Sequence, residues 1–136
     1  MIQRDGYQVS LWQDSVLPYE SSNNASNSDP YDVIIVGGGI TGLSTAILLQ
    51  EQGKKCLLLE AHTLCFGTTG GTTAHLNTLL DTPYTTIRKN FSSDSARLIA
   101  DATAEAIQLI RNNIRRYNIE CDFEEADAYL FSQDDT

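Results

Sequence analysis

Basic residues, histidines and long hydrophobic runs are all scarce in this chain of 136 residues. Nine lysines and arginines stand against eighteen aspartates and glutamates, which gives a formal net charge of −9. An acidic surface repels phosphate groups, so nucleic acids and anionic membranes are poor partners. The apolar stretches are too short to cross a bilayer, and residues 1–30 contain no sustained apolar segment of the kind found in a signal peptide. We therefore expect a cytoplasmic protein without a membrane or nucleic-acid partner.

Metal-binding and reactive side chains are equally few. The two histidines, His62 and His75, are isolated from each other, whereas a metal site needs three or four convergent ligands. The cysteine and histidine spacing of an iron–sulfur site is also lacking, so we expect no metal in this chain. For both histidines a surface role is favoured, although His75 lies close enough to a glycine-rich loop to contact a ligand. Cys65 has no basic neighbour in the sequence, which favours an unreactive thiol.

The chain has a polar linker near its start. Residues 21–30 (SSNNASNSDP) cannot bury an apolar face. We therefore divide the chain into an N-terminal extension and linker, residues 1–30, and a folded body, residues 31–136. Whether the extension docks on that body stays open, and Trp12 favours docking only weakly.

The folded body begins with the pattern of a βαβ unit. Residues 32–36 and 56–60 are short apolar runs, typical of parallel strands buried on both faces, and residues 43–52 predict a helix that ends at Gly53. Residues 61–86 are rich in glycine and threonine and predict a long loop, which is unusual in a compact domain unless it binds something.

A long amphipathic helix and a hairpin complete the expected elements. Residues 93–117 predict the helix, with Ser93 or Asp94 as its N-cap. Its apolar face is formed by Leu98, Ala102, Ala106, Leu109 and Ile114. Residues 121–123 and 128–132 predict two short strands of a hairpin. The expected fold class is α/β, a Rossmann-like unit that binds FAD or NAD(P) and whose sheet is incomplete.

Residues 37–42 (GGGITG) match the pattern G-x-G-x-x-G between the first strand and the helix. In this pattern Gly37 makes the tight turn, Gly39 lets a pyrophosphate approach the backbone, and Gly42 lets the helix pack on the sheet. The pyrophosphate then lies at the positive end of the helix, against N–H groups that have no intrahelical acceptor. A glycine pattern alone is weak evidence, but the flanking strand and helix make dinucleotide binding the better interpretation than a merely glycine-rich turn.

Glu60 supports the same interpretation. It lies 18 residues beyond Gly42, at the end of the second strand, where such folds place a carboxylate for the ribose hydroxyls. Its negative charge would repel a 2′-phosphate, which disfavours NADP. The glycine pattern and Glu60 do not separate FAD from NAD.

The loop at residues 67–74 (GTTGGTTA) favours FAD. It offers four hydroxyl groups, and its three glycines let backbone amides approach a ligand closely. Without its context this segment would pass for a flexible surface loop.

The order of these segments resembles a known family. Residues 31–60, the 67–74 loop, the helix from Ser93 and the segment through residue 130 are similar to the N-terminal third of FAD-dependent oxidoreductases of the D-amino-acid-oxidase-like superfamily. The form GTTGGTTA most resembles members that carry a C-terminal Rieske domain. The resemblance covers about residues 31–132.

The resemblance implies a role for each matching residue. The glycines Gly37, Gly39 and Gly42 would line the pyrophosphate together with Ile40 and Thr41, and Glu60, followed by Ala61, would hold the adenosine ribose. Thr68 and Thr69 would contact the phosphates, and Thr73 and Ala74 would lie nearer the flavin ring. Some relatives attach FAD covalently through a histidine in this loop; Gly71 stands at that position here, so non-covalent FAD is expected. Where Rieske-bearing members often carry a basic residue after the loop, this chain has His75.

The resemblance also implies a function for the full-length protein, namely oxidation of a C–N bond in a small-molecule amine or amino acid. The remaining strands and the substrate domain would come from sequence outside these residues, so the piece alone is expected to be inactive and prone to self-association through an unpaired sheet edge. No residue here is expected to act as a catalytic acid or base, because the flavin accepts the hydride. The alternatives are the nucleotide domain of an NAD-dependent dehydrogenase and a non-catalytic nucleotide-binding module.

Overall fold

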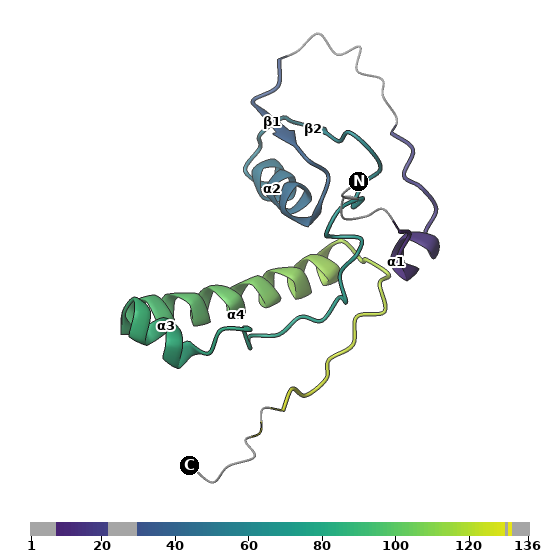
Figure 1. Cartoon of the computed structure of the whole chain (residues 1–136). Helices are drawn as coiled ribbons and strands as arrows, with labels where there is room; N and C mark the ends of the chain where they lie inside the picture. The colour runs from purple at the N-terminus through teal and green to yellow at the C-terminus, as the bar shows by residue number, and fades with distance from the viewer. Residues whose placement is uncertain (1–7, 22–29, 130, 132–136) are drawn as a thin grey trace, which may run out of the picture. The chain divides into compact units, whose positions relative to one another are not determined.

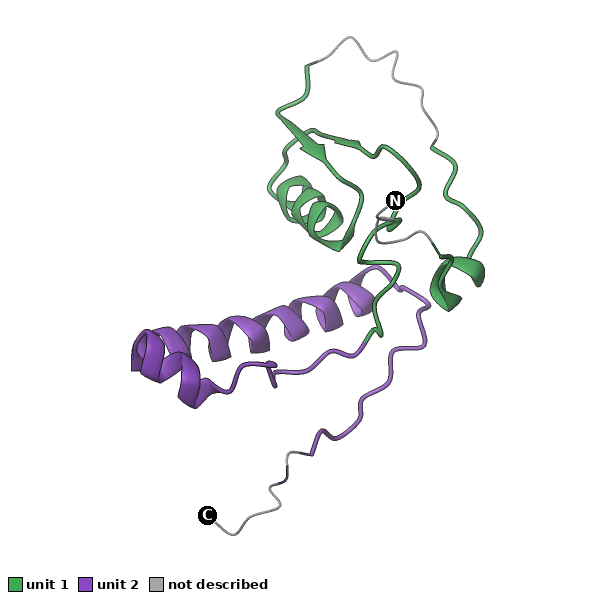
Figure 2. Ribbon diagram, in the orientation of Figure 1, with its two compact units in different colours: residues 1–74 green, residues 75–136 purple. Residues whose placement is uncertain are grey.

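The computed structural model describes residues 8–21, 30–129 and 131. The chain divides into two compact units, residues 1–74 and residues 75–136 (Figures 1 and 2). The first unit contains the predicted βαβ motif and a short helix that precedes it. The second contains a pair of helices.

The βαβ motif of the first unit has two parallel strands and one helix. Strand β1 (Val33–Val36) pairs with β2 (Cys56–Leu59), in a register that places Val33 opposite Cys56 and Val36 opposite Leu59. Helix α2 (Ile40–Glu51) connects them and packs on both strands (Figure 1). The predicted strand–helix–strand order is therefore confirmed.

The ends of α2 follow from its glycines. The helix begins at Ile40, three residues earlier than the sequence predicted, because Gly39 serves as its N-cap and the last half of the glycine motif is already helical. At the other end Gly53 adopts a φ of +76°, which favours glycine and ends the helix as predicted.

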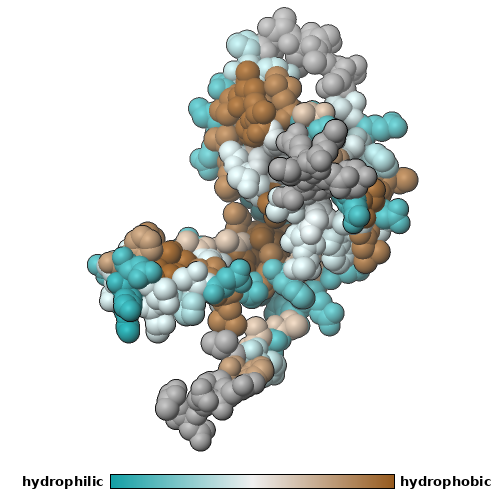
Figure 3. All heavy atoms as spheres, viewed as in Figure 1, coloured by the Kyte–Doolittle hydropathy of each residue, from teal (hydrophilic) through white to brown (hydrophobic). Residues whose placement is uncertain are grey.

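Among the described residues the two strands are not buried on both faces, which corrects the prediction. Ile35, whose Cγ2 atom lies next to Gly42 of α2, is 9% exposed, whereas Ile34 and Val36 are 60% and 84% exposed. Neighbouring side chains of a strand point to opposite faces, and among the described residues α2 is the one helix that packs on the sheet. Figure 3 shows hydrophobic atoms at the surface of this part of the molecule.

The short helix α1 (Leu11–Asp14) lies in the N-terminal extension. Its residues contact the glycine and threonine loop: the Trp12 Nε1–H group donates to the Thr72 carbonyl oxygen at 2.9 Å. The docking that the sequence left open is therefore observed for residues 8–21.

The second unit consists of α3 (Tyr84–Asn90) packed on α4 (Ser93–Arg116). The long predicted helix is confirmed, but its N-cap is Ser92, whose hydroxyl accepts from the Ser95 N–H group, and not Ser93 or Asp94. Helix α3 was missed, since its first half was assigned to the 61–86 loop. Its segment has a weak helix propensity, with Pro83 and two threonines, and it is held instead by tertiary packing of Ile87, which is 6% exposed.

Two further predictions for this unit were wrong in detail. Along α4 the half-buried stripe runs through Ile99, Thr103 and Ile107, whereas three members of the predicted apolar face (Leu98, Ala102 and Ala106) are exposed. No hairpin forms in residues 121–129, and the rest of the second predicted strand lies partly outside the described residues. Arg111 Nε of α4 and Glu125 Oε1 of this segment lie 2.9 Å apart in an ion pair whose glutamate is exposed. Such pairs contribute little to stability, and among the described residues no strand pairs with the segment.

Candidate functional site

The glycine turn connects β1 to α2. Gly37 has a φ of +111°, a conformation that side-chain-bearing residues rarely adopt. A β-carbon added to Gly42 would overlap the carbonyl oxygen of Gly37, so only glycine lets the first turn of α2 lie against the turn. The first N–H groups of a helix have no intrahelical acceptor and carry partial positive charge. The turn therefore presents polarised amides at the carboxyl end of β1.

Glu60 lies at this turn. Its Oε2 atom accepts a hydrogen bond from the Gly38 N–H group at 2.6 Å, and its Oε1 atom accepts from the His62 N–H group at 2.9 Å. These hydrogen bonds favour the charged form, and they hold the pKa of the Glu60 carboxyl below its ordinary value. An ionised acceptor is thus fixed beside the glycine amides.

The loop after Glu60 packs on the other side of the turn. The Cys65 N–H group donates to the Gly38 carbonyl oxygen at 3.0 Å, and the Ile40 N–H group donates to Thr69 Oγ1 at 3.1 Å. Burial, reinforced by the charge of Glu60, raises the pKa of the Cys65 thiol, which supports the unreactive thiol expected from the sequence.

The structure gathers most of the predicted site residues at the turn. Gly37, Gly39, Gly42, Glu60 and Thr69 lie together there, with Ile40 and Thr41 in the first helical turn. The side chains of Ala61, Thr68, Thr73 and Ala74 are exposed. Ala74 has a φ of +60°, and its N–H group donates to Thr72 Oγ1 at 3.2 Å. His75 is exposed as well, and His62 stacks on Phe66 with ring centroids 4.4 Å apart.

Two residues of the site, Gly38 and Gln13, were missed by sequence reasoning. Gly38, a variable position of the motif, is buried, and a β-carbon there would come 2.5 Å from Leu64 Cδ2. Gln13 was also missed, although it ends a capping-box pattern, S-x-x-Q, that begins at Ser10. That pattern would have predicted the start of a helix in the extension.

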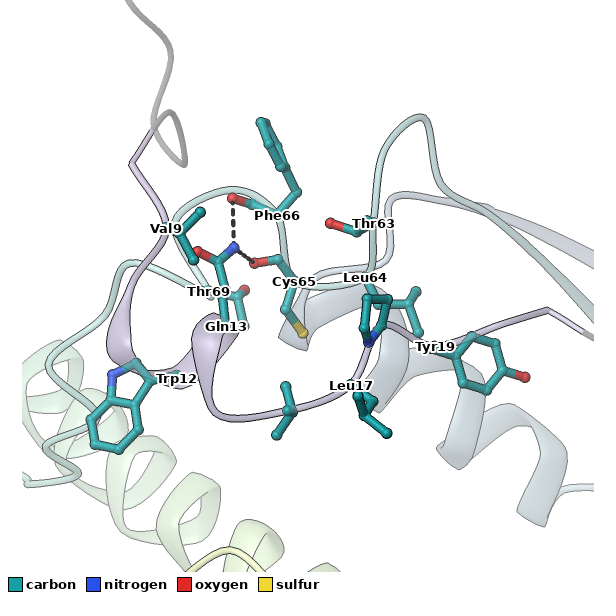
Figure 4. Close-up of a pocket in the computed structure, with 13 residues that line it drawn as sticks. Val9, Trp12, Gln13, Leu17, Tyr19, Thr63, Leu64, Cys65, Phe66 and Thr69 are labelled. Carbon is teal, nitrogen blue, oxygen red and sulfur yellow. Dashed lines mark hydrogen bonds between the residues drawn. The ribbon is translucent and has the colours of Figure 1, made fainter.

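The extension and the loop line a half-open cavity of about 610 Å³ (Figure 4). Trp12, Leu17, Leu64 and Phe66 give it mostly apolar walls, and Gln13 contributes a polar group. Figure 4 shows the Gln13 amide directed at the backbone of the loop. The cavity belongs entirely to the first unit.

Two kinds of site are not found in the part of the chain that the structure describes. Residues 8–21, 30–129 and 131 contain no group of three or more histidine, cysteine, aspartate or glutamate side chains that could hold a metal ion. Within the same residues no helix is long and apolar enough to span a membrane.

Comparison with known proteins identifies the class to which this fold and site belong. Residues 32–136 match the model of the FAD dependent oxidoreductase (DAO) family. The chain therefore belongs to this family, and the family cofactor is FAD. This match resolves the choice between FAD and NAD that the glycine motif leaves open.

Three known proteins align with most of the chain. It is 39% identical over 74% of its length to the "Putative Rieske 2Fe-2S iron-sulfur protein YhfW" of Bacillus subtilis (strain 168). It is 32% identical over 92% of its length to the gamma-glutamylputrescine oxidoreductase of Escherichia coli (strain K12), and 31% identical over 73% to the "Probable oxidoreductase OrdL" of Haemophilus influenzae. The aligned part is only 20%, 29% and 23% of these three relatives. No solved structure gives a significant match.

Proposed function

We propose that the full-length protein oxidises a C–N bond of a small amine or amino acid, and that these residues hold the ADP part of its FAD. The proposal rests on the position of the Glu60 carboxylate. Its Oε2 atom lies 2.6 Å from the backbone nitrogen of Gly38, just before α2 begins. This arrangement puts an acceptor for hydroxyl groups next to amides that attract an anion.

The glycine turn fits a diphosphate. The backbone at Gly39 has open space except for Thr69 Oγ1, which would lie 3.0 Å from an added β-carbon. A phosphate oxygen can take the place of this hydroxyl oxygen as acceptor for the Ile40 N–H group, and the hydroxyl of Thr69 can then donate to the phosphate. Thr41 and Gly42 contribute the next amides of the helix N-terminus. The diphosphate is thus bound by backbone N–H groups and by one side chain of the loop.

Glu60 suits the adenosine ribose. Each carboxylate oxygen has more than one lone pair, so Glu60 can keep its hydrogen bond from Gly38 and also accept from a ribose hydroxyl. Its low pKa keeps it an acceptor at neutral pH. Ala61 follows without a bulky side chain. These residues bind and orient the cofactor, and hydride transfer from the substrate is the chemistry that FAD supplies when bound.

The other residues of the 67–74 loop are assigned by the same proposal to the phosphates and the flavin ring. Thr68 is placed at the phosphates, and Thr73 and Ala74 nearer the ring. Gly71 stands where some relatives attach the cofactor, so the proposed FAD is non-covalent. His75 follows the loop and is exposed.

The substrate class rests on the relatives. One of them is named for the oxidation of gamma-glutamylputrescine, an amine, which supports oxidation of an amine or amino acid here. We place the protein in the cytoplasm, expect the 136 residues alone to be inactive, and expect their exposed strand edges to favour self-association.

Anaerobic mixing of the full-length protein with a panel of amines and amino acids tests this proposal. Loss of the visible flavin absorbance with at least one of them is expected, and added NAD should not displace the flavin. A bound flavin that hydroxy acids reduce and amines do not would contradict the substrate class. Displacement of the flavin by NAD would contradict the cofactor assignment.

A further inference from the structure

We propose that the N-terminal extension positions residues 65–72, the cofactor loop, with Gln13 and Trp12 as the positioning residues. The inference rests on the proposed binding of FAD at the glycine turn, and it assigns a role to a segment outside the matched family region, which begins at residue 32. The extension would act through the backbone of residues 65–72 and touch neither FAD nor substrate.

The orientation of Gln13 is fixed by its own helix. Ser10 and Gln13 form a capping box: the Ser10 hydroxyl accepts from the Gln13 N–H group at 3.3 Å, and Gln13 Oε1 accepts from the Ser10 N–H group at 3.0 Å. Because the side-chain oxygen is engaged by an N–H donor, the Nε2 group must point the other way. That direction is toward the loop (Figure 4).

Gln13 and Trp12 reach the two ends of the loop. Gln13 Nε2 donates to the carbonyl oxygens of Cys65 and Phe66, each at 3.4 Å, while Trp12 Nε1 donates to Thr72 at 2.9 Å. The Gln13 hydrogen bonds are long and individually weak. All three acceptors are backbone atoms, so these contacts fix the course of the loop.

Close packing at Gly70 strengthens the contact. Gly70 is buried, and a β-carbon there would lie 2.5 Å from Gln13 Nε2 and 2.7 Å from Gln13 Cδ, and would overlap the Cys65 carbonyl oxygen. Only glycine lets the loop backbone approach the glutamine amide this closely. The GTTGGTTA pattern therefore carries one glycine whose role is contact with the extension.

The loop that Gln13 and Trp12 hold also contacts the glycine turn. Within the segment that α1 contacts, Cys65 N–H donates to the Gly38 carbonyl oxygen and Thr69 Oγ1 accepts from Ile40 N–H. Residues 65–70 are thus held by the extension on one side and by the turn on the other. A loop released from Gln13 would no longer hold the Thr69 hydroxyl beside the Ile40 amide, where it is proposed to donate to the diphosphate.

Gln13→Glu in the full-length protein tests the inference. The glutamate keeps the size and the acceptor for Ser10 but replaces the donor with an oxygen that repels the two loop carbonyls. Trp12→Phe removes only the indole donor and keeps an aromatic ring. Gln50→Glu, at an exposed position of α2, makes the same charge change away from the loop and serves as the matched control.

The inference predicts an effect on ligands that contain phosphate. Gln13→Glu should raise the Kd for FAD and for ADP about tenfold, equivalent to ~1.4 kcal/mol, with a smaller rise for Trp12→Phe. The Kd for adenosine, which has no phosphate, should match that of the control. In the protein without FAD, the Ile40 amide should exchange its hydrogen faster in Gln13→Glu, while the amides of β1 keep the exchange rates of the control.

Three results would overturn the inference. Unchanged FAD and ADP binding in Gln13→Glu would show that the contact does not position the loop. Equal weakening of adenosine binding, together with a lower melting temperature, would show a purely structural role. A wild-type protein that binds no FAD would refute the proposed function itself, a result distinct from the first two.

Discussion

At the scale of single residues, the site depends on where Glu60 directs its two carboxylate oxygens. One accepts from Gly38 in the glycine turn and the other from His62 in its own loop. The carboxylate therefore joins the end of β2 to the turn after β1, even before a ribose is considered. This dual role explains why an acid at this position suits the fold as well as the ligand.

The hydrogen bonds of Glu60 predict a pH dependence of stability. Its pKa in the folded protein is lowered from the ordinary value of 4.5, so its contribution to the free energy of unfolding is fully present above that value and is lost as the pH falls through the lowered pKa. Wild type should be more stable than Glu60→Gln at neutral pH, and the difference should shrink in acid. Urea denaturation at a series of pH values measures this difference.

Glu105→Gln, an exposed change of the same charge on α4, is the control for that series. The difference in the free energy of unfolding between wild type and Glu105→Gln should not shrink in acid. A difference between wild type and Glu60→Gln that is constant with pH would mean that the carboxylate does not hold the turn in solution.

The sequence identified Glu60, Gly39 and Gly42 correctly as neighbours of one turn, because their spacing is imposed by the βαβ connection. It did not identify Gly38 or Gln13. Gly38 is a glycine because Leu64 and Glu60 pack on it, and such contacts between distant segments leave no periodic pattern. Thr69 was selected by resemblance, and its contact with Ile40 is visible only in three dimensions.

At the scale of elements, the packing of α2 on the turn is set by Gly42. Gly42→Ala places a β-carbon against the Gly37 carbonyl oxygen, which cannot move without shifting β1 or α2. Overpacking of this kind costs about 1–3 kcal/mol, which exceeds the benefit that alanine brings to a helix. We expect a lower free energy of unfolding, measured by urea denaturation.

Gly71→Ala is the matched control for Gly42→Ala. Its β-carbon would lie 4.0 Å from the nearest atom, the Thr68 carbonyl oxygen, so its stability should remain within about 0.5 kcal/mol of wild type. If Gly42→Ala were as stable as Gly71→Ala, the close approach of helix and turn would not exist in solution.

Regular elements with a strong local pattern were predictable, and those that depend on distant contacts were not. The strands, α2 and α4 follow from apolar runs and helical spacing. Helix α3 depends on burial of Ile87 against α4, and the predicted hairpin lacks a neighbouring strand in the described residues. The half-buried stripe of α4 differs from the apolar face that the sequence predicted. The helix carries apolar residues on two adjacent faces, and the sequence alone does not say which of them α3 covers.

At the scale of the whole molecule, much apolar surface is exposed. Ile34, Val36 and Leu98 are each at least 60% exposed. Among the described residues the buried apolar side chains are Ile35 in the first unit and Ile87 in the second. The chain spans less than a third of the relatives it matches. We propose that the further sequence of such proteins covers the exposed faces of the sheet and of α4.

The central claim is that the turn between β1 and α2 holds the diphosphate of FAD. The flavin content of purified full-length protein, wild type and Gly39→Val, tests it most directly, with circular dichroism to show that both are folded. We predict that wild type carries flavin, whereas Gly39→Val, whose side chain fills the space beside Thr69, carries none and gains none from added FAD. A folded Gly39→Val protein with the flavin content of wild type would contradict the account.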